Sequence, residues 1–143
     1  MTCLILLNGP PGIGKSTLSA LYTDRHHGTL NLDIDSLHRL VGGWRDPENR
    51  THDVLRPVAL AMASTHLGGG RDVILPQYLS LVDEIEAFEK VARDRGAEFR
   101  EPPQKKVSFS SRSATKALTR STRQMWFSCR TPSVGSPVSG SPW

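Results

Sequence analysis

A chain of 143 residues with two cysteines and a formal net charge of +4 has room for one domain with a buried core and is too poor in cysteine to depend on disulfides. Its first ten residues lack the basic start of a signal peptide, and the apolar run at 3–7 is too short to cross a membrane. We therefore expect a cytoplasmic protein with no membrane partner.

The positive charge is unevenly distributed along the chain. Seven of the 18 Lys and Arg residues lie in residues 102–143, which hold no Asp or Glu, whereas residues 1–101 hold the other 11 against all 14 acidic residues. The first part therefore carries a formal charge of −3 and does not favour nucleic-acid binding. The basic character belongs to the C-terminal segment.

A buried-type strand, a glycine-rich loop and a helix follow one another at the start of the chain. The apolar run Cys3–Leu7 predicts a central parallel strand, and a helical pattern begins near Lys15. Between them the sequence matches G-x-x-x-x-G-K-[ST], the phosphate-binding loop in the context that confirms it. The loop residues are Gly9, Pro10, Pro11, Gly12, Ile13, Gly14, Lys15, Ser16 and Thr17.

This loop predicts a site for a nucleoside triphosphate, ATP, together with Mg²⁺. Its three glycines let successive backbone N–H groups point at one phosphate, and the helix N-terminus adds partial positive charge. We expect the Lys15 ammonium to reach the β- and γ-phosphates as a catalytic cation, and Ser16 Oγ to bind Mg²⁺. Thr17 is expected to contact the α-phosphate. The alternative, a chance match in a Gly/Pro turn, is disfavoured by the flanking strand and helix.

A second strand is predicted over 29–35, where apolar and polar residues alternate. Ligands bind at the carboxyl ends of parallel strands, so Asp33 and Asp35 are expected at that edge, on one face of the strand. Asp35 is the candidate for orienting or deprotonating a phosphoryl acceptor, and Asp33 for Mg²⁺. The alternative is that Asp35 or Ser36 caps the helix that follows.

Two glycines break that helix, and an exposed loop follows them. In it Trp44 can stack on a substrate and Arg45 can bind an anion; a packed Trp and a solvated Arg are equally consistent with the sequence. A longer helix is predicted from Thr51 to His66, in which Pro57 either bends the helix or marks its first turn.

The third strand, predicted over 72–78, ends in Gln77 and Tyr78 and not in the acidic residue of a Walker B motif. The carboxylate for Mg²⁺ must then come from Asp33. Gln77 is a candidate for orienting a substrate or a water molecule. A strand-end polar residue without a function is the alternative for Gln77.

The rest of the first part predicts one more helix and one more strand. Ser80 and Asp83 form a capping-box signature for an amphipathic helix, which Gly96 ends. Residues 97–101 then begin a fourth strand. Strands that alternate with helices predict an α/β fold in three layers, α/β/α, with a mostly parallel sheet, as in P-loop NTPases.

Residues 102–143 are rich in Ser, Thr, Pro, Lys and Arg and have no sustained helical or strand period. We predict a disordered basic tail there, after an incomplete kinase-like nucleotide-binding domain at 1–101. A basic tail can bind nucleic acid or an acidic surface. The alternative is a segment without an evolved function, produced by an altered reading frame.

With GPPGIGKST at 9–17, LDID at 32–35 and VILPQY at 73–78, residues 1–101 resemble the front portion of the small P-loop kinases. That group includes the gluconate, shikimate, adenylate and polynucleotide 5′-hydroxyl kinases. The same residues are similar to bacterial proteins described as AAA-family ATPases or ATP-binding proteins. The resemblance implies a parallel sheet in the order 2-3-1-4-5, of which this chain lacks the fifth strand.

The resemblance also implies roles for particular residues. In those kinases an acid after strand two contacts the acceptor hydroxyl, and Asp35 matches that position. An arginine soon after it binds the substrate, and Arg39 is the nearest match. The lid helix with its arginines has no recognisable counterpart in residues 1–101, and the candidates in the tail are Arg112, Arg120 and Arg123.

The sequence thus predicts an ATP-dependent kinase that transfers the γ-phosphoryl group to a hydroxyl of a small molecule or of a nucleic-acid 5′ end. Two alternatives stay open. One is a truncated ATP-binding module with weak turnover, and the other is a general NTPase that hydrolyses ATP without an acceptor.

Overall fold

The computed structural model describes residues 1–102 of the chain. In chain order the elements are β1 (Cys3–Leu6), α1 (Lys15–Arg25), β2 (Leu30–Asn31), α2 (Ile34–His38), the 3₁₀ turn η1 (Pro47–Asn49), α3 (Thr51–Gly68), β3 (Val73–Leu75), α4 (Val82–Asp94) and β4 (Glu98–Arg100). The predicted disordered tail, its nucleic-acid binding and the candidate lid arginines lie outside the described residues.

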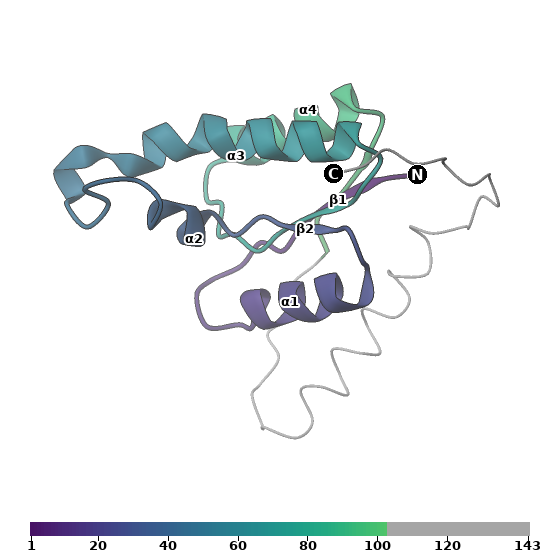
Figure 1. The fold of residues 1–143 in the computed structure, drawn as a ribbon, viewed down its shortest axis with the longest axis horizontal. Helices are drawn as coiled ribbons and strands as arrows, with labels where there is room; N and C mark the ends of the chain where they lie inside the picture. Colours follow the sequence, from purple (N-terminus) through teal and green to yellow (C-terminus); the bar gives the residue numbers. More distant parts are fainter. Residues whose placement is uncertain (103–143) are drawn as a thin grey trace, which may run out of the picture. The chain divides into compact units, whose positions relative to one another are not determined.

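The four strands form one sheet, parallel throughout, in the order β2-β3-β1-β4. Ile5 of β1 pairs with Ile74 on one side and with Arg100 on the other, which places β1 inside the sheet. Helices α3 and α4 cover one face and α1 covers the other (Figure 1). The predicted three-layer α/β/α fold and strand order are confirmed, and within residues 1–102 no fifth strand follows β4.

The apolar core lies between the sheet and the pair α3 and α4. Residues 3–7 are each at most 4% exposed, because β1 has neighbouring strands on both sides and helices on both faces. Phe88 of α4 fills the layer above the sheet, while Ala59 and Ala63 of α3 are small enough to let that helix lie close. Burial of a side chain as large as Phe88 contributes roughly 1.5–3 kcal/mol, so this layer holds the helices in place.

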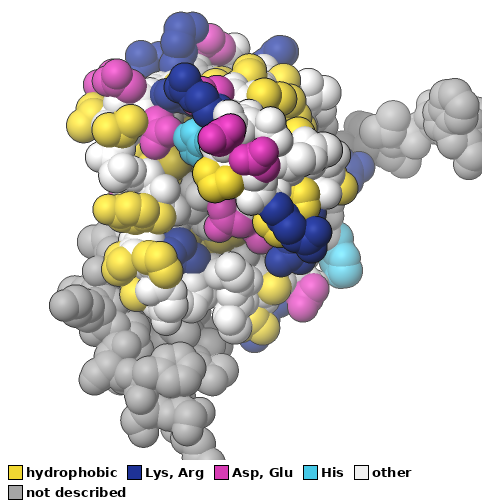
Figure 2. Space-filling view, turned by 90° about the vertical axis from the view of Figure 1, so that its left-hand side faces the viewer, with side chains coloured by type: hydrophobic (Ala, Val, Ile, Leu, Met, Phe, Trp, Pro, Cys, Tyr) yellow, Lys and Arg dark blue, Asp and Glu magenta, His cyan; other side chains and the backbone are white. Residues whose placement is uncertain are grey.

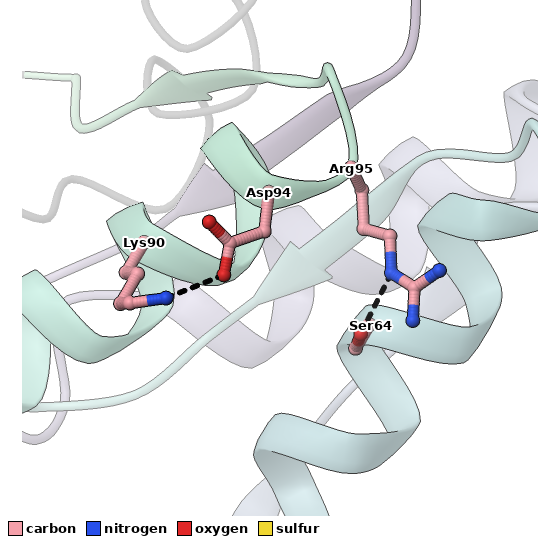
Figure 3. Close-up of polar contacts among 4 residues, drawn as sticks. All are labelled: Ser64, Lys90, Asp94 and Arg95. Carbon is pink, nitrogen blue, oxygen red and sulfur yellow. Dashed lines mark hydrogen bonds and ion pairs between the residues drawn. The ribbon is translucent and has the colours of Figure 1, made fainter.

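Polar contacts on the surface add to the pairing of α3 and α4 (Figure 3). Arg95, just after α4, donates from Nε to Ser64 Oγ of α3 at 2.9 Å. On α4 itself, Lys90 and Asp94 form an ion pair of 2.6 Å between residues one turn apart. Exposed contacts of this kind contribute about 0–1 kcal/mol each to stability, so the apolar packing and not these contacts determines how the helices lie.

Helix α4 ends as the sequence predicts. Gly96 has a φ of 65°, in the left-handed region. Its N–H donates to Arg93 O at 3.0 Å, and the N–H of Ala97 donates to Ala92 O at 2.9 Å, which is the hydrogen-bond pair of a Schellman motif. The motif turns the chain directly into β4.

The prediction for the second strand was wrong in its extent. β2 covers Leu30–Asn31, and Asp33 leaves the sheet to become the N-cap of α2. Asp33 Oδ1 accepts from the N–H groups of Asp35 and Ser36 at 3.1 and 3.4 Å. Such a side-chain-to-backbone bond competes with the strand ladder, so the chain turns into a helix two residues early. The capping residue is thus Asp33 and neither Asp35 nor Ser36.

Two helix boundaries also differ from the prediction. Leu81 is the N-cap of α4, and no side chain caps that end, so the expected Ser80–Asp83 capping box does not form. Helix α3 continues to Gly68, beyond the expected end at His66. Helix α3 begins at Thr51 as predicted and Pro57 lies inside it, which excludes the alternative that Pro57 marks the first turn.

Because all strands run in the same direction, their carboxyl ends meet at one edge of the sheet. This edge lies on the left of Figure 1 and faces the viewer in Figure 2, where hydrophobic, basic and acidic side chains are interspersed. The glycine-rich loop, α2 and the residues after β3 all follow strands that end here. Within residues 1–102 no helix is both long and apolar enough to cross a membrane.

Candidate functional site

The loop between β1 and α1 has the backbone that its glycines permit. Gly12 and Gly14 have φ values of 84° and 91°, in the left-handed region that residues with a Cβ rarely adopt. No atom lies within 4 Å of the position that a Cβ would take at either residue, so the requirement for glycine comes from the backbone and not from crowding. The loop therefore curls without obstruction in front of α1.

The N-terminus of α1 opens onto this loop. Gly14 is the N-cap, no side chain caps the first turn, and that turn contains no acidic residue. The first N–H groups of the helix therefore keep their capacity to bind an anion, and the helix dipole favours negative charge there. Ser16 and Thr17 lie exposed in the same turn.

The Lys15 side chain folds back over the loop. Its ammonium donates to Gly9 O at 2.6 Å and to Pro10 O at 2.8 Å. These two carbonyl groups hold the cation beside the loop backbone, where the sequence predicts the phosphates. The ammonium thus lies beside the loop, and its contact with the β- and γ-phosphates stays a prediction.

Asp33 is half-buried and is engaged on both oxygens. Besides the two N–H groups of α2 on Oδ1, its Oδ2 accepts from Ser36 Oγ at 2.8 Å. The sequence predicted this carboxylate as a Mg²⁺ partner, and that role stays a prediction. The hydrogen bonds hold the side chain in one orientation.

Asp35 and Arg39 are the two candidate acceptor residues on and beside α2. Asp35 lies in the first turn and Arg39 is the C-cap, and both are exposed. Neither forms an ion pair within residues 1–102, although they are four residues apart. Both side chains are thus available to a ligand.

Trp44 and Arg45 form one unit on the exposed loop after α2. The guanidinium carbon of Arg45 lies 4.8 Å from the centre of the Trp44 ring, a cation–π contact. The neighbouring turn is held by Asn49, which donates from Nδ2 to Gly43 O at 2.9 Å. Both side chains are exposed, with Trp44 36% exposed, so their roles in binding a substrate or an anion stay predictions.

Gln77 lies just beyond β3. In the sheet β3 lies between β2, which leads to α2, and β1, which leads to the glycine-rich loop. Its Oε1 is buried and has no hydrogen-bond partner among the described residues. A buried acceptor without a donor is rare, and it is expected to receive one from a ligand or a water molecule. Tyr78, which follows it, is 54% exposed and was not predicted as a site residue.

Two further groups at this edge escaped the sequence reasoning. Asn8, between β1 and the first glycine, makes hydrogen bonds to the residues after β3 and β4. The sequence contains one indication of this role, because Asn8 is a polar residue between a buried strand and the loop. The other group joins three helices: His38 Nδ1 lies 2.9 Å from Thr51 Oγ1, and His52 lies 3.9 Å from the buried Glu84. No sequence spacing links these residues, because α2, α3 and α4 meet only in the fold.

Comparisons with known proteins identify the family and the fold of the chain. A family model described as an AAA domain matches residues 4–103. A mutant of the APS kinase CysC from Mycobacterium tuberculosis aligns with a TM-score of 0.58 and 18% identity, over 88% of this chain and 99% of that chain, and so shares its fold. A tunicamycin resistance protein from Deinococcus radiodurans aligns with a TM-score of 0.49 and 21% identity, over 71% and 61% of the two chains. No curated protein sequence matches.

Proposed function

Because this chain belongs to the AAA-domain family of P-loop proteins, we propose that it binds Mg·ATP on residues 9–17 and transfers the γ-phosphoryl group to a hydroxyl. The acceptor is a small molecule or a nucleic-acid 5′ end. The observation that carries the proposal is the glycine loop with the Lys15 ammonium held over it. A glycine loop and a lysine cation of this kind can together position and neutralise a triphosphate.

Binding follows from the loop's free donors. The backbone N–H groups of the loop and of the first turn of α1 surround the phosphates, and Lys15 moves from two neutral carbonyl groups to a phosphate oxygen. A charge-assisted hydrogen bond is about twice as strong as a neutral one, so this exchange favours the bound nucleotide. The absence of an acidic residue in the first turn of α1 keeps repulsion low.

The donor set fits a magnesium ion. Ser16 has an exposed hydroxyl in the first turn of α1, with no hydrogen-bond partner of its Oγ among residues 1–102, and Asp33 offers an oriented carboxylate. Hydroxyl and carboxylate oxygens are the ligands that Mg²⁺ prefers. Ser16 would hold the ion directly and Asp33 through water. The ion would neutralise the charge that builds up on the phosphate oxygens during transfer.

The acceptor is proposed to lie over α2 and the end of β3. Asp35, exposed and without an ion pair in the described part of the chain, orients the acceptor hydroxyl and takes its proton. As the oxygen–phosphorus bond to the acceptor forms, the bond to ADP breaks, and ADP leaves with the electron pair. The Gln77 side chain, whose buried Oε1 has no partner among the described residues, turns to accept a hydrogen bond from the acceptor, and Arg39 binds a negative group on the acceptor. Trp44 and Arg45 form the outer rim.

A matched pair of lysine variants tests nucleotide binding. Lys15→Ala is expected to lower the affinity for Mg·ATP, measured by titration calorimetry, by at least about tenfold, because a charge-assisted contact is worth roughly 1.5–3 kcal/mol. The control is Lys90→Ala, which removes the other lysine of residues 1–102 from an exposed ion pair on α4. Equal affinity of wild type and Lys15→Ala would overturn the assignment of the loop.

A transfer assay then separates the functions that share this loop. Radiolabelled ATP is offered with gluconate, shikimate, a nucleoside, APS, an aminoglycoside and a 5′-hydroxyl oligonucleotide. A labelled acceptor that disappears in Asp35→Asn supports the kinase. Phosphate release without any acceptor supports a general NTPase, and tight binding with neither product supports an ATP-binding module with weak turnover.

A further inference from the structure

Asn8 lies between strand β1 and the phosphate-binding loop. It follows β1 and directly precedes Gly9, the first residue of the phosphate-binding loop. Its side chain is half-buried and its polar atoms are engaged away from the loop. Oδ1 accepts from the N–H of Leu79 at 3.1 Å, and Nδ2 donates to Leu79 O at 3.1 Å and to Glu101 Oε1 at 2.9 Å.

These bonds join three carboxyl ends of the sheet. Leu79 belongs to the segment between β3 and α4, which also holds Gln77, and Glu101 directly follows β4. Since β1 lies between β3 and β4, a side chain at the end of β1 reaches both neighbours. Asn8 uses both amide hydrogens and the amide oxygen for this purpose, so its orientation is defined from two sides.

The pairing with Leu79 continues the sheet beyond its last strand residues. The β1–β3 ladder ends near Leu75, where the N–H of Leu7 donates to Leu75 O at 2.9 Å. Leu79 is only 5% exposed, and among the described residues its backbone forms no other loop or turn hydrogen bond. Buried backbone groups need hydrogen-bond partners, and beyond the end of the β1–β3 ladder the Asn8 amide supplies them to the N–H and C=O of Leu79.

We propose that Asn8 is a positioning residue that sets the distance between the nucleotide loop and the acceptor segment 76–81. The inference rests on the proposed function, in which Gly9 begins the phosphate site and Gln77 contacts the acceptor. One amide fixes both by holding the backbone of Leu79 against the start of the loop. Phosphoryl transfer depends on in-line placement, and a misplacement of about 1 Å costs about 10²-fold in rate.

Two substitutions change this contact in different ways. Asn8→Ala removes all three hydrogen bonds. Asn8→Asp keeps an acceptor for the Leu79 N–H but sets a carboxylate oxygen against Leu79 O and Glu101 Oε1, which are themselves acceptors. Adding Glu101→Gln to Asn8→Asp supplies a donor on the other side of that contact and reverses its polarity. The double variant is expected to recover part of the lost function.

The readouts are the affinity for Mg·mant-ATP, a fluorescent ATP analogue, and the rate of ATP consumption with and without the acceptor panel. We expect each single variant to lose at least about tenfold in rate or affinity, within the loss that misplacement of reacting groups produces. Arg95→Ala, which removes an exposed side-chain contact to Ser64 Oγ between α4 and α3, is the control. Leu67→Ala, at the far end of α3, shows what lost stability alone does.

The outcomes separate this inference from the proposed function. Asn8 variants that match wild type in both readouts, while Lys15→Ala loses binding, would overturn the positioning role and leave the nucleotide site intact. Asn8 variants that lose no more than Leu67→Ala at equal stability would overturn it as well. Rescue by Glu101→Gln supports it. If Lys15→Ala binds as wild type does, the proposed function fails, and the role of Asn8 fails with it.

Discussion

Asp33 offers a direct test of how the chain turns from β2 into the edge that carries the site. The test compares Asp33→Ala with Asp33→Asn. Alanine removes the acceptor for the N–H groups of Asp35 and Ser36 and the contact to Ser36 Oγ. Asparagine keeps an oxygen in the capping position and removes the negative charge, and it caps helices about as well as aspartate does.

The expected losses follow from the cap geometry. Replacing an N-cap Asp by Ala costs about 1 kcal/mol, with a range of about 0.5–2, and the longer bond of 3.4 Å to Ser36 N places this cap at the middle of the range. In a domain of roughly 100 residues, 1 kcal/mol lowers the melting temperature by about 4–8 °C. Asp33→Asn should stay within about 0.5 kcal/mol of wild type. The cost reaches the whole domain because Ile34, which follows Asp33, is buried.

Urea denaturation of the full chain, followed by circular dichroism, measures these differences. Asp46→Ala is the control, since Asp46 caps the exposed turn η1 by accepting from Glu48 N at 3.0 Å, and its loss should cost less. Equal stability of Asp33→Ala and wild type would refute the capping argument. An Asp33→Asn variant as unstable as Asp33→Ala would show that the charge, and not the cap, stabilises α2.

The same pair of variants separates the cap from the predicted metal role. If Asp33 also holds Mg²⁺ through water, Asp33→Asn should need more Mg²⁺ to reach the same affinity for ATP while the fold stays intact. Titration calorimetry at a series of Mg²⁺ concentrations measures this. An unchanged Mg²⁺ requirement would leave Asp33 with a structural role alone.

Three further variants probe the scaffold. Gly96→Ala should cost about 1–2 kcal/mol in urea denaturation, because alanine is strained at a φ of 65°, and a neutral result would contradict the Schellman motif. Phe88→Ala should cost about 3–5 kcal/mol by the same measurement, as expected for a fully buried aromatic side chain, and a loss below about 1 kcal/mol would mean that the layer collapses into the space. His38→Asn retains a polar atom near Nδ1 and should preserve the contact to Thr51, whereas His38→Ala should release α2 from α3. A double-mutant cycle of His38→Ala with Thr51→Ala measures the coupling energy between the two side chains, and a coupling energy of zero would exclude the hydrogen bond.

Under the proposed function, the position of the candidate site in the fold lets one edge of the sheet hold both the nucleotide and the acceptor. The loop follows β1, α2 follows β2, and the segment with Gln77 follows the strand between them. Parallel strands bring these three segments to one edge without long connections. Changes in the 42–50 loop or in the residues after β3 can therefore alter the acceptor while the nucleotide loop stays the same.

The amino-acid sequence alone determined the loop, the fold class and the capped end of α4. Glycines at 9, 12 and 14, a lysine and a hydroxyl residue at set spacing leave little room for another backbone, because the requirement is local and each residue meets it by its own conformation. The apolar run of β1 and the helical patterns predicted a sheet between helices, because the spacing of apolar residues along the chain is also a local property. Gly96 ended its helix where the pattern said it would.

Only the tertiary structure decided which polar residues meet at the edge. Alternation over 29–35 predicted one long strand. In the structure, Asp33 caps α2 and the strand ends at Asn31, because β2 lies at the edge of the sheet with one neighbour and gains little from further pairing. The contacts of Asn8 with Leu79 and Glu101 span 71 and 93 residues, and no local pattern encodes such distances. Burial of Gln77 Oε1 likewise depends on what packs around the end of β3. Contacts within a few residues follow from local conformation, whereas contacts between distant segments follow from how the layers pack.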